Sequence, residues 1–366
     1  RNTVATRVNE NGLIEEVAAN VPRLDYSDGG CPSLLLEPTA TNLITYSEDF
    51  SDASWVKTRS SILINNSISP EGTLTADKII ASTDNATHRV DFYYALTDNS
   101  TYTYSIFAKK GEYNCFALQI GSTSISSDSA EFNLNTGVST SGGGTIISSK
   151  IEPLSNDWFK CSLTMLAGVT DIVNLGIGND NVYSFVGDGT SGLYLWGAQF
   201  EENSYATSYI KTVGTTQTRS ADTANGAGNS TVINSSEGTL YAEISALADD
   251  GTGRSICLSN GTNSNRALVS YDASSNKILA FHNNGIGQVS LESIVTNTTD
   301  FHKVAFKFAQ NDFALWIDGV EVQTNLLKGV NIPNTFDRLD FKNASGSSPF
   351  YGKTKSLQVY TTALSD

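Results

Sequence analysis

The sequence predicts an all-β protein: two tandem antiparallel β-sandwich (jelly-roll) domains behind an extended N-terminal lead-in. Most polar residues of this 366-residue chain are Ser, Thr, Asn and Gly, while charged residues make up only 17%, a balance that favours strands and turns over helices. Short apolar runs recur along the chain, each bounded by Gly, Asn, Asp or Ser, which is typical of a sandwich. No segment demands a long helix.

Residues 1–42 are expected to form the lead-in. Pro22, Pro32 and Pro38 interrupt this stretch, and 34–36 is its only compact apolar run, so it cannot form a core of its own. Residues 43–213 should form the first sandwich. Its predicted strands are 78–80, 90–94, 102–108, 116–120, 159–165 and 193–200.

Residues 214–236 are predicted to be a linker, because they carry no periodic apolar pattern and are rich in Gly, Ser, Thr and Asn. Residues 237–366 should form the second sandwich. Its predicted strands are 240–244, 256–258, 267–271, 278–282, 304–308, 313–317, 339–341 and 357–360.

Residues 301–322 give the clearest local signal. Val304, Phe306 and Phe308 alternate with smaller or polar residues, and an apolar alternation resumes after a four-residue loop at 313, 315 and 317. An Asp318-Gly319 pair then supplies a two-residue hairpin turn. The sequence therefore predicts two adjacent hairpins with one inward face.

Net charge and hydropathy exclude two classes of partner. The chain carries 23 basic and 38 acidic residues, a net charge of −15, so it should repel nucleic acid and anionic membranes. No run of 18 apolar residues and no secretory leader is visible, so we expect neither a membrane span nor a signal peptide. Because Met165 is the only methionine, Arg1 is not expected to be a translational start.

Cysteine spacing indicates neither a metal nor a redox site. Cys31, Cys115, Cys161 and Cys257 are widely separated and form no C-x-x-C pair. Cys161 is in phase with the apolar residues of its strand, whereas Cys115 is in phase with Ala117 and Gln119. We expect all four thiols to be free.

Catalytic motifs are also missing from the sequence. The three histidines lack the spacing of a metalloprotease, no G-x-S-x-G occurs, and the GKT at 352–354 lacks the upstream glycine of a phosphate loop. A glycosidase needs two facing carboxyl groups, but the adjacent pairs 201–202 and 249–250 point to opposite faces of a strand. A binding protein is therefore favoured over an enzyme.

Exposed aromatic residues are the remaining candidates for a carbohydrate site, because sugar rings stack on aromatic faces. Trp158 and Trp196 lie in dense apolar runs and should be buried. Trp316 is out of phase with Leu315 and its apolar neighbours, so it should lie on the outer face of its sheet as a binding platform or interface residue. Tyr351 is either at the same end of the domain or a core anchor.

Two family resemblances add to this interpretation. "FHKVAFKFAQNDFALWIDGVEV" at 301–322 and "FYGKTKSLQVYTTALSD" at 350–366 resemble the penultimate hairpin and last strand of the laminin-G-like, concanavalin-type jelly roll. That resemblance covers 237–366 and implies the fold. It does not imply a ligand, because this fold carries lectins, hydrolases, lyases and adhesion modules.

The first sandwich resembles the carbohydrate-binding-module-like jelly rolls of bacteriophage tail and head-fibre proteins. This resemblance rests on "NLITYSEDFSDASW" at 42–55 and "LYLWGAQFEENSYATSYI" at 193–210, preceded by "ATRVNENGLIEEVAANVPRLDY" at 5–26. It implies a virion-surface or extracellular protein that contacts other virion subunits, often as a homotrimer. It also implies a structural calcium, for which Glu48, Asp49, Glu201 and Glu202 are the candidates; no spacing rule selects among them.

The leading hypothesis is a non-enzymatic phage fibre or appendage protein that binds a glycan or a host cell-surface polysaccharide, with Trp316 and Tyr351 as candidate binding residues. One alternative is a polysaccharide lyase or hydrolase, a depolymerase, on the same fold. Another is a purely structural virion decoration protein. A bacterial surface adhesin would share almost all of these features.

Overall fold

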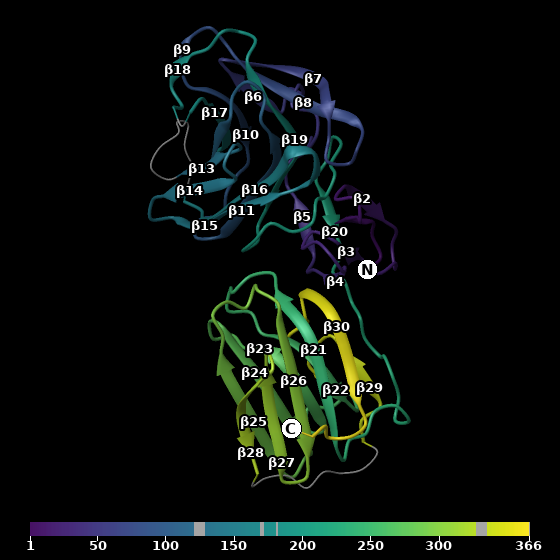
Figure 1. Ribbon diagram of the computed structural model, residues 1–366. Coiled ribbons are helices and arrows are strands. Elements are labelled where there is room, and N and C mark those ends of the chain that lie inside the picture. The colour runs from purple at the N-terminus through teal and green to yellow at the C-terminus, as the bar shows by residue number, and fades with distance from the viewer. Residues whose placement is uncertain (121–128, 169–171, 181, 327–334, 366) are drawn as a thin grey trace.

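The computed structural model describes residues 1–120, 129–168, 172–180, 182–326 and 335–365. Within them the chain consists of strands and loops, and its one helical element is the single 3-10 turn Ser155–Asp157. Two sandwiches lie end to end, with the N-terminal strands at their junction (Figure 1). No helix in the described part of the chain is long and apolar enough to cross a membrane. The predicted all-β class is confirmed.

The first sandwich is built of two six-stranded antiparallel sheets. One sheet contains, in spatial order, β14 (Val138–Gly142), β13 (Ser129–Asn133), β12 (Cys115–Ile120), β17 (Ile172–Gly178), β10 (His88–Tyr93) and β6 (Trp55–Thr58). The other contains β15 (Ile146–Pro153), β16 (Trp158–Leu166), β11 (Thr101–Lys109), β19 (Gly192–Glu201), β8 (Leu74–Ala81) and β7 (Ser60–Ile68). A two-stranded ribbon, β9 (Asn85–Ala86) with β18 (Phe185–Val186), lies beside them.

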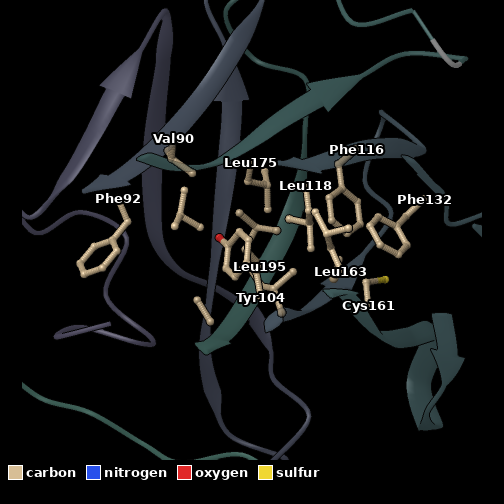
Figure 2. Packing of buried hydrophobic residues seen from close by; sticks show 14 of the residues in the cluster. Val90, Phe92, Tyr104, Phe116, Leu118, Phe132, Cys161, Leu163, Leu175 and Leu195 are labelled. Atoms are coloured by element: carbon tan, nitrogen blue, oxygen red, sulfur yellow. The ribbon is translucent and has the colours of Figure 1, made fainter. Parts of the chain in front are cut away.

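Strand alternation builds the core between these sheets, because successive side chains point to opposite faces. Phe116 and Leu118 of β12 meet Phe132, Leu163 and Leu195 there, all of them buried (Figure 2). Cys161 also lies in this core, whereas Cys115 is buried outside it. None of the four cysteines forms a disulfide, as predicted.

Trp158 and Trp196 are buried as predicted, but in a different core. Together with Phe107 and Tyr209 they cover the outer face of the second sheet and pack against Ile14 of the lead-in. Ordinary alternation places Trp196 opposite Leu193 and Leu195. A bulge in β19 between its pairings with Ser105 and Phe107 then shifts the phase of the strand, so that Ala198 and Phe200 return to the core between the sheets.

The second sandwich pairs a seven-stranded sheet with a five-stranded sheet. The larger contains β28 (Val320–Asn325), β27 (Asp312–Ile317), β26 (His302–Ala309), β21 (Gly238–Ala246), β30 (Gly352–Tyr360), β4 (Ser33–Leu36) and β3 (Leu24–Asp25). The smaller contains β25 (Gln288–Ile294), β24 (Lys277–Asn283), β23 (Arg266–Tyr271), β22 (Arg254–Ser259) and β29 (Arg338–Asp340). Val304, Phe306, Phe308, Phe313, Leu315 and Ile317 all face the core between them, so the inward face predicted for the two hairpins is confirmed.

The lead-in forms regular paired strands, whereas its prolines predicted only an extended segment. Its strands β1 (Ala5–Val8) and β2 (Ile14–Val17) form a hairpin that covers the tryptophan face of the first sandwich. Its strand β4 pairs with β30 and so extends the larger sheet of the second sandwich. Its last strand, β5 (Ala40–Asn42), pairs with β20 (Gln217–Arg219). The lead-in has no core of its own: Ile14 packs in the tryptophan core of the first sandwich, and β4 adds a strand to the larger sheet of the second.

Residues 214–236 are also structured, which corrects their prediction as a linker. They supply β20, a bridge from Ala227 to Leu339, and Ile233, which is 3% exposed in the second core. The segment has no apolar period, as its sequence shows. Strand pairing and four buried residues, Arg219, Asp222, Ile233 and Ser235, fix it instead.

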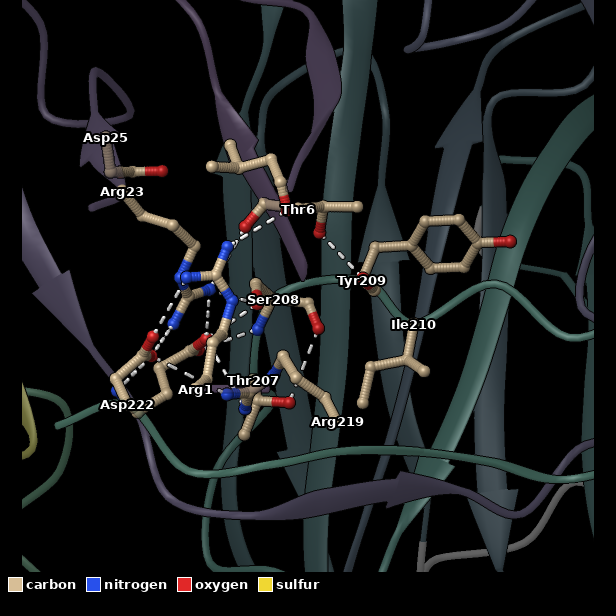
Figure 3. Close-up of polar contacts among 12 residues, drawn as sticks. Arg1, Thr6, Arg23, Asp25, Thr207, Ser208, Tyr209, Ile210, Arg219 and Asp222 are labelled. Carbon is tan, nitrogen blue, oxygen red and sulfur yellow. Dashed lines mark hydrogen bonds and ion pairs between the residues drawn. The ribbon is translucent and has the colours of Figure 1, made fainter. Parts of the chain in front are cut away.

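Buried charges join the lead-in to this segment. Arg23 pairs with Glu37 at 2.6 Å and with Asp222 (Figure 3). Arg219 approaches both carboxylates, and Arg1 pairs with Asp222 at 3.4 Å. Burial alone would raise the pKa of Glu37, but Arg219 and Arg23 outweigh it and hold that pKa far below its usual value. The junction is therefore a buried ionic cluster.

Candidate functional site

The outer face of the seven-stranded sheet carries the candidate site. Leu240, Ala242 and Ile244 of β21 are fully buried in the core, so the alternating residues 239, 241 and 243 point to the other side. The neighbouring strands β26 and β30 alternate in the same way. Cross-strand pairing then fixes which outward residues meet.

Three strands form a shallow trough of about 260 Å³ on this face. Tyr241 lies at its centre, paired with Ala305 on β26 and with Gln358 on β30. Because Ala305 carries only a methyl group, it leaves room beside the tyrosine ring. The other lining residues are Thr239, Glu243, Lys303, Ser356, Tyr360 and Leu364.

The C-terminal tail closes one end of the trough. The backbone N–H of Leu364 donates to the Thr239 hydroxyl at 3.2 Å, and that of Ala363 reaches Glu237 at 3.4 Å. These bonds hold the side chain of Leu364 in the lining, beside Tyr360. That end of the trough is therefore apolar and aromatic.

Hydrogen-bonding groups continue along the trough. The Tyr360 hydroxyl donates to the side-chain oxygen of Gln358, whose amide nitrogen reaches the Ser356 hydroxyl at 3.4 Å. Partial burial, followed by the neighbouring Glu243, raises the pKa of Tyr241. Its hydroxyl therefore stays protonated at neutral pH and can both donate and accept a hydrogen bond.

A carboxylate and an ammonium group lie opposite each other at the far end of the trough. Glu243 and Lys303 are direct cross-strand partners, yet within the described chain neither makes an ion pair with any residue. Glu243 is also the one carboxylate among the residues that line the trough. Hydrolysis of a glycosidic bond needs a facing pair of carboxyl groups, so this lining suits binding better than cleavage.

Trp316 lies on this outer face, where the sequence placed it. It pairs with Ala305, and its neighbours Leu315 and Ile317 face the core. Two strand spacings separate it from Tyr241, about 10 Å. Trp316 does not line the trough itself, but it extends the same face beyond Ala305.

Tyr351 lies elsewhere. It is half-buried and precedes β30, seven residues before Gln358, which places it roughly 20 Å along the sheet from the trough. Burial, and then the nearby Asp222, raises the pKa of its hydroxyl, so it belongs to the surroundings of the junction cluster. The structure does not bring the two predicted binding residues together.

The carboxylates proposed for calcium are occupied by protein partners or dispersed. Glu48 accepts from Tyr209 at 2.8 Å and pairs with Lys211 at 2.7 Å. Glu201 is 1% exposed and accepts from Thr207 and Gln199. Among the residues that the structure describes, no three acidic, His or Cys side chains are grouped to hold a metal. Calcium stays a prediction, with no support from these side chains.

Tyr241 and Tyr360 were missed as site residues, although the sequence carried a signal for both. Each is out of phase with the apolar residues of its strand, as Trp316 is. What the sequence could not provide was the strand order β26-β21-β30, which places residues about 60 to 120 positions apart on one patch of surface.

One family model and several solved structures are similar to parts of this chain. Residues 217–366 match a laminin-G family model described as the concanavalin A-like lectin/glucanases superfamily. Among solved structures, the chain is similar to domains LG4-5 of the mouse laminin alpha1 chain, at 10% identity and a TM-score of 0.28, over 89% of this chain and 95% of that one. The LG1-3 region of the laminin alpha2 chain matches at 10% identity and a TM-score of 0.30, over 75% of this chain and 65% of that one.

No curated protein matches the chain. The family match covers β20, the segment that follows it and strands β21 to β30 of the second sandwich, but not β3 and β4. Residues 217–366 of this chain are therefore similar in sequence to the laminin-G-like, concanavalin A-like lectin/glucanase domains that the family model describes.

Proposed function

We propose that the outer face of the C-terminal sheet binds carbohydrate, and that the chain is a non-enzymatic attachment protein. The observation that carries the proposal is the trough itself, in which Tyr241 and Tyr360 lie among side chains that both donate and accept hydrogen bonds. The carbohydrate-binding capability of the concanavalin A-like fold supports it.

The chemistry of the trough suits a sugar. The C–H faces of a sugar ring stack on aromatic rings, which Tyr241 and Tyr360 provide. Ring hydroxyls need both donors and acceptors, which the Ser356 hydroxyl, Gln358, Lys303 and the Glu243 carboxylate supply. A shallow, open trough fits one or two residues of a longer chain better than an enclosed small molecule.

The finer proposal is a phage fibre or appendage on the virion surface that attaches to a host polysaccharide, with other virion subunits as partners. It rests on the resemblance of 5–26, 42–55 and 193–210 to phage fibre proteins. A depolymerase is the second candidate function, and the single carboxylate in the trough counts against it.

Affinity electrophoresis through gels that contain bacterial and algal polysaccharides tests the proposal. We expect at least one polymer to retard the chain, Tyr241→Ala to abolish that retardation, and Tyr93→Ala, an exposed tyrosine of the first sandwich, to leave it unchanged. The recovered polymer should keep its length. Shortened polymer would establish the depolymerase, and retardation that survives Tyr241→Ala would remove the trough from the binding site.

A further inference from the structure

The ionic cluster at the junction has an excess of positive charge. Three guanidinium groups, those of Arg1, Arg23 and Arg219, are joined by ion pairs to only two carboxylates, Glu37 and Asp222. All five side chains are at most 6% exposed. The cluster therefore buries a net charge of about +1, which is unfavourable without a compensating anion.

Arg23 makes close ion pairs with both carboxylates, Glu37 and Asp222. Glu37 accepts from Arg23 at 2.6 Å and from the hydroxyl and backbone N–H of Ser208 at 2.6 and 2.7 Å. Asp222 accepts from Arg23 and from the backbone N–H of Glu37 at 3.0 Å. Arg219 is left with longer approaches, at 3.4 Å to Glu37 and 3.8 Å to Asp222.

Several guanidinium N–H groups around Arg219 also lack a hydrogen-bond acceptor. None of the three side-chain nitrogens of Arg219 donates a hydrogen bond, although the side chain is 1% exposed. The Nε atoms of Arg1 and Arg23 are also buried without an acceptor. Buried guanidinium N–H groups are normally satisfied, and groups like these point to a water or an ion between them.

We infer that the junction binds a small monovalent inorganic anion, a halide such as chloride, held by Arg219 and the neighbouring guanidinium groups of Arg1 and Arg23 (Figure 3). One negative charge cancels the excess, and a spherical anion accepts from several N–H groups without a fixed geometry. A polyanion such as phosphate would overcompensate an excess of one and needs more room.

The anion would hold the two sandwiches together. Arg1 and Arg23 belong to the lead-in, which contributes strands to the second sandwich, and Arg219 ends β20, which pairs with β5. Ser208, which binds the same Glu37, follows the last long strand of the first sandwich. Halide binding at this point therefore stabilises the arrangement of all three segments.

The direct test uses crystals of the intact chain grown with bromide in place of chloride. We expect an anomalous peak within hydrogen-bonding distance of the Arg219 guanidinium. A site filled by water alone, or no density at all beside Arg219, would overturn the inference.

A solution test keeps the inference falsifiable if no crystals grow. At constant ionic strength, with gluconate as the bulky replacement anion, the Tm of the wild-type chain should rise with chloride or bromide concentration. Arg219→Gln balances the cluster charge and should abolish that dependence, whereas Arg338→Gln, in an exposed pair with Asp337, should keep it. If Arg219→Gln fails to fold, a wild-type Tm independent of halide still overturns the inference, as does a halide dependence that persists in a folded Arg219→Gln chain.

Discussion

His282 is the residue whose protonation should matter most to the second sandwich. It is 1% exposed and its ring lies against Phe308, Phe313 and Phe336. Burial lowers its pKa to about 4, whereas an unfolded histidine titrates near 6.5. The folded domain therefore holds the neutral imidazole within an aromatic cluster.

We predict that this domain loses stability as the pH falls from 6.5 towards 4. In that window the unfolded state binds a proton that the folded state does not, so the free energy of unfolding decreases with falling pH. The shift corresponds to about 3 kcal/mol at most. Urea unfolding at a series of pH values checks it. His282→Phe, which fits the aromatic surroundings, should remove this component; an equal acid loss in that variant would contradict the account.

The trough also shows how far the alternation of inward and outward residues along a strand can predict a site. Trp316 was placed on the outer face because it is out of step with Leu315, and the structure agrees. Tyr241 and Tyr360 follow the same rule, but nothing local distinguishes a functional outward tyrosine from an ordinary one. Only the strand pairing that joins them shows that they share a surface.

Gly197 lies in the bulge of β19, after which Ala198 and Phe200 return to the core of the first domain. Its φ is +62°, and a Cβ there would lie 2.9 Å from the Phe107 ring and 3.2 Å from Tyr209. A side chain at this position would be strained in its backbone and would also push on the tryptophan face. Gly226 offers a matched comparison, because its φ is +74° but nothing lies within 4 Å of its Cβ position.

We predict that Gly197→Ala destabilises the first domain by about 2–4 kcal/mol, which combines left-handed strain with overpacking. Gly226→Ala should cost only the strain, about 1–2 kcal/mol. Chemical denaturation monitored by tryptophan fluorescence measures both variants. Equal losses would show that contact with Phe107 does not matter at the bulge.

Strands with a strong apolar alternation could be predicted from the sequence, whereas exposed or very short strands could not. The run 304–308 became β26 (His302–Ala309), and 102–108 became β11 (Thr101–Lys109). By contrast β7 (Ser60–Ile68) is mostly exposed, and β20 is three residues long. Such strands form because a neighbour offers hydrogen bonds, which is a property of the tertiary structure rather than of their own sequence.

The two sandwiches are joined by strand pairing and buried charge at the scale of the whole molecule. Residues 214–236 resembled a flexible linker in composition, yet Arg219 is 1% exposed and Ile233 is 3% exposed. Peptide bonds in a segment held in this way should be poor protease substrates, because cleavage requires local unfolding.

We predict that trypsin does not cut after Arg219 in the native chain. Mass spectrometry of early digestion products gives the answer, with the urea-unfolded chain as the positive control. Glu37→Gln removes the carboxylate shared by Arg23 and Arg219, so it should expose that bond and speed cleavage at least several-fold. Early cleavage after Arg219 in the wild-type chain would show that the segment is a mobile linker.

The central claim, that the C-terminal sheet binds carbohydrate on its outer face, is tested most directly by NMR titration with a polysaccharide fragment that retards the chain. We predict that the largest backbone shift changes fall at Tyr241, Glu243, Ala305 and Gln358, the residues that line the trough. Shift changes confined to the first sandwich, or to loops at the ends of the second, would place the binding site elsewhere and contradict the account.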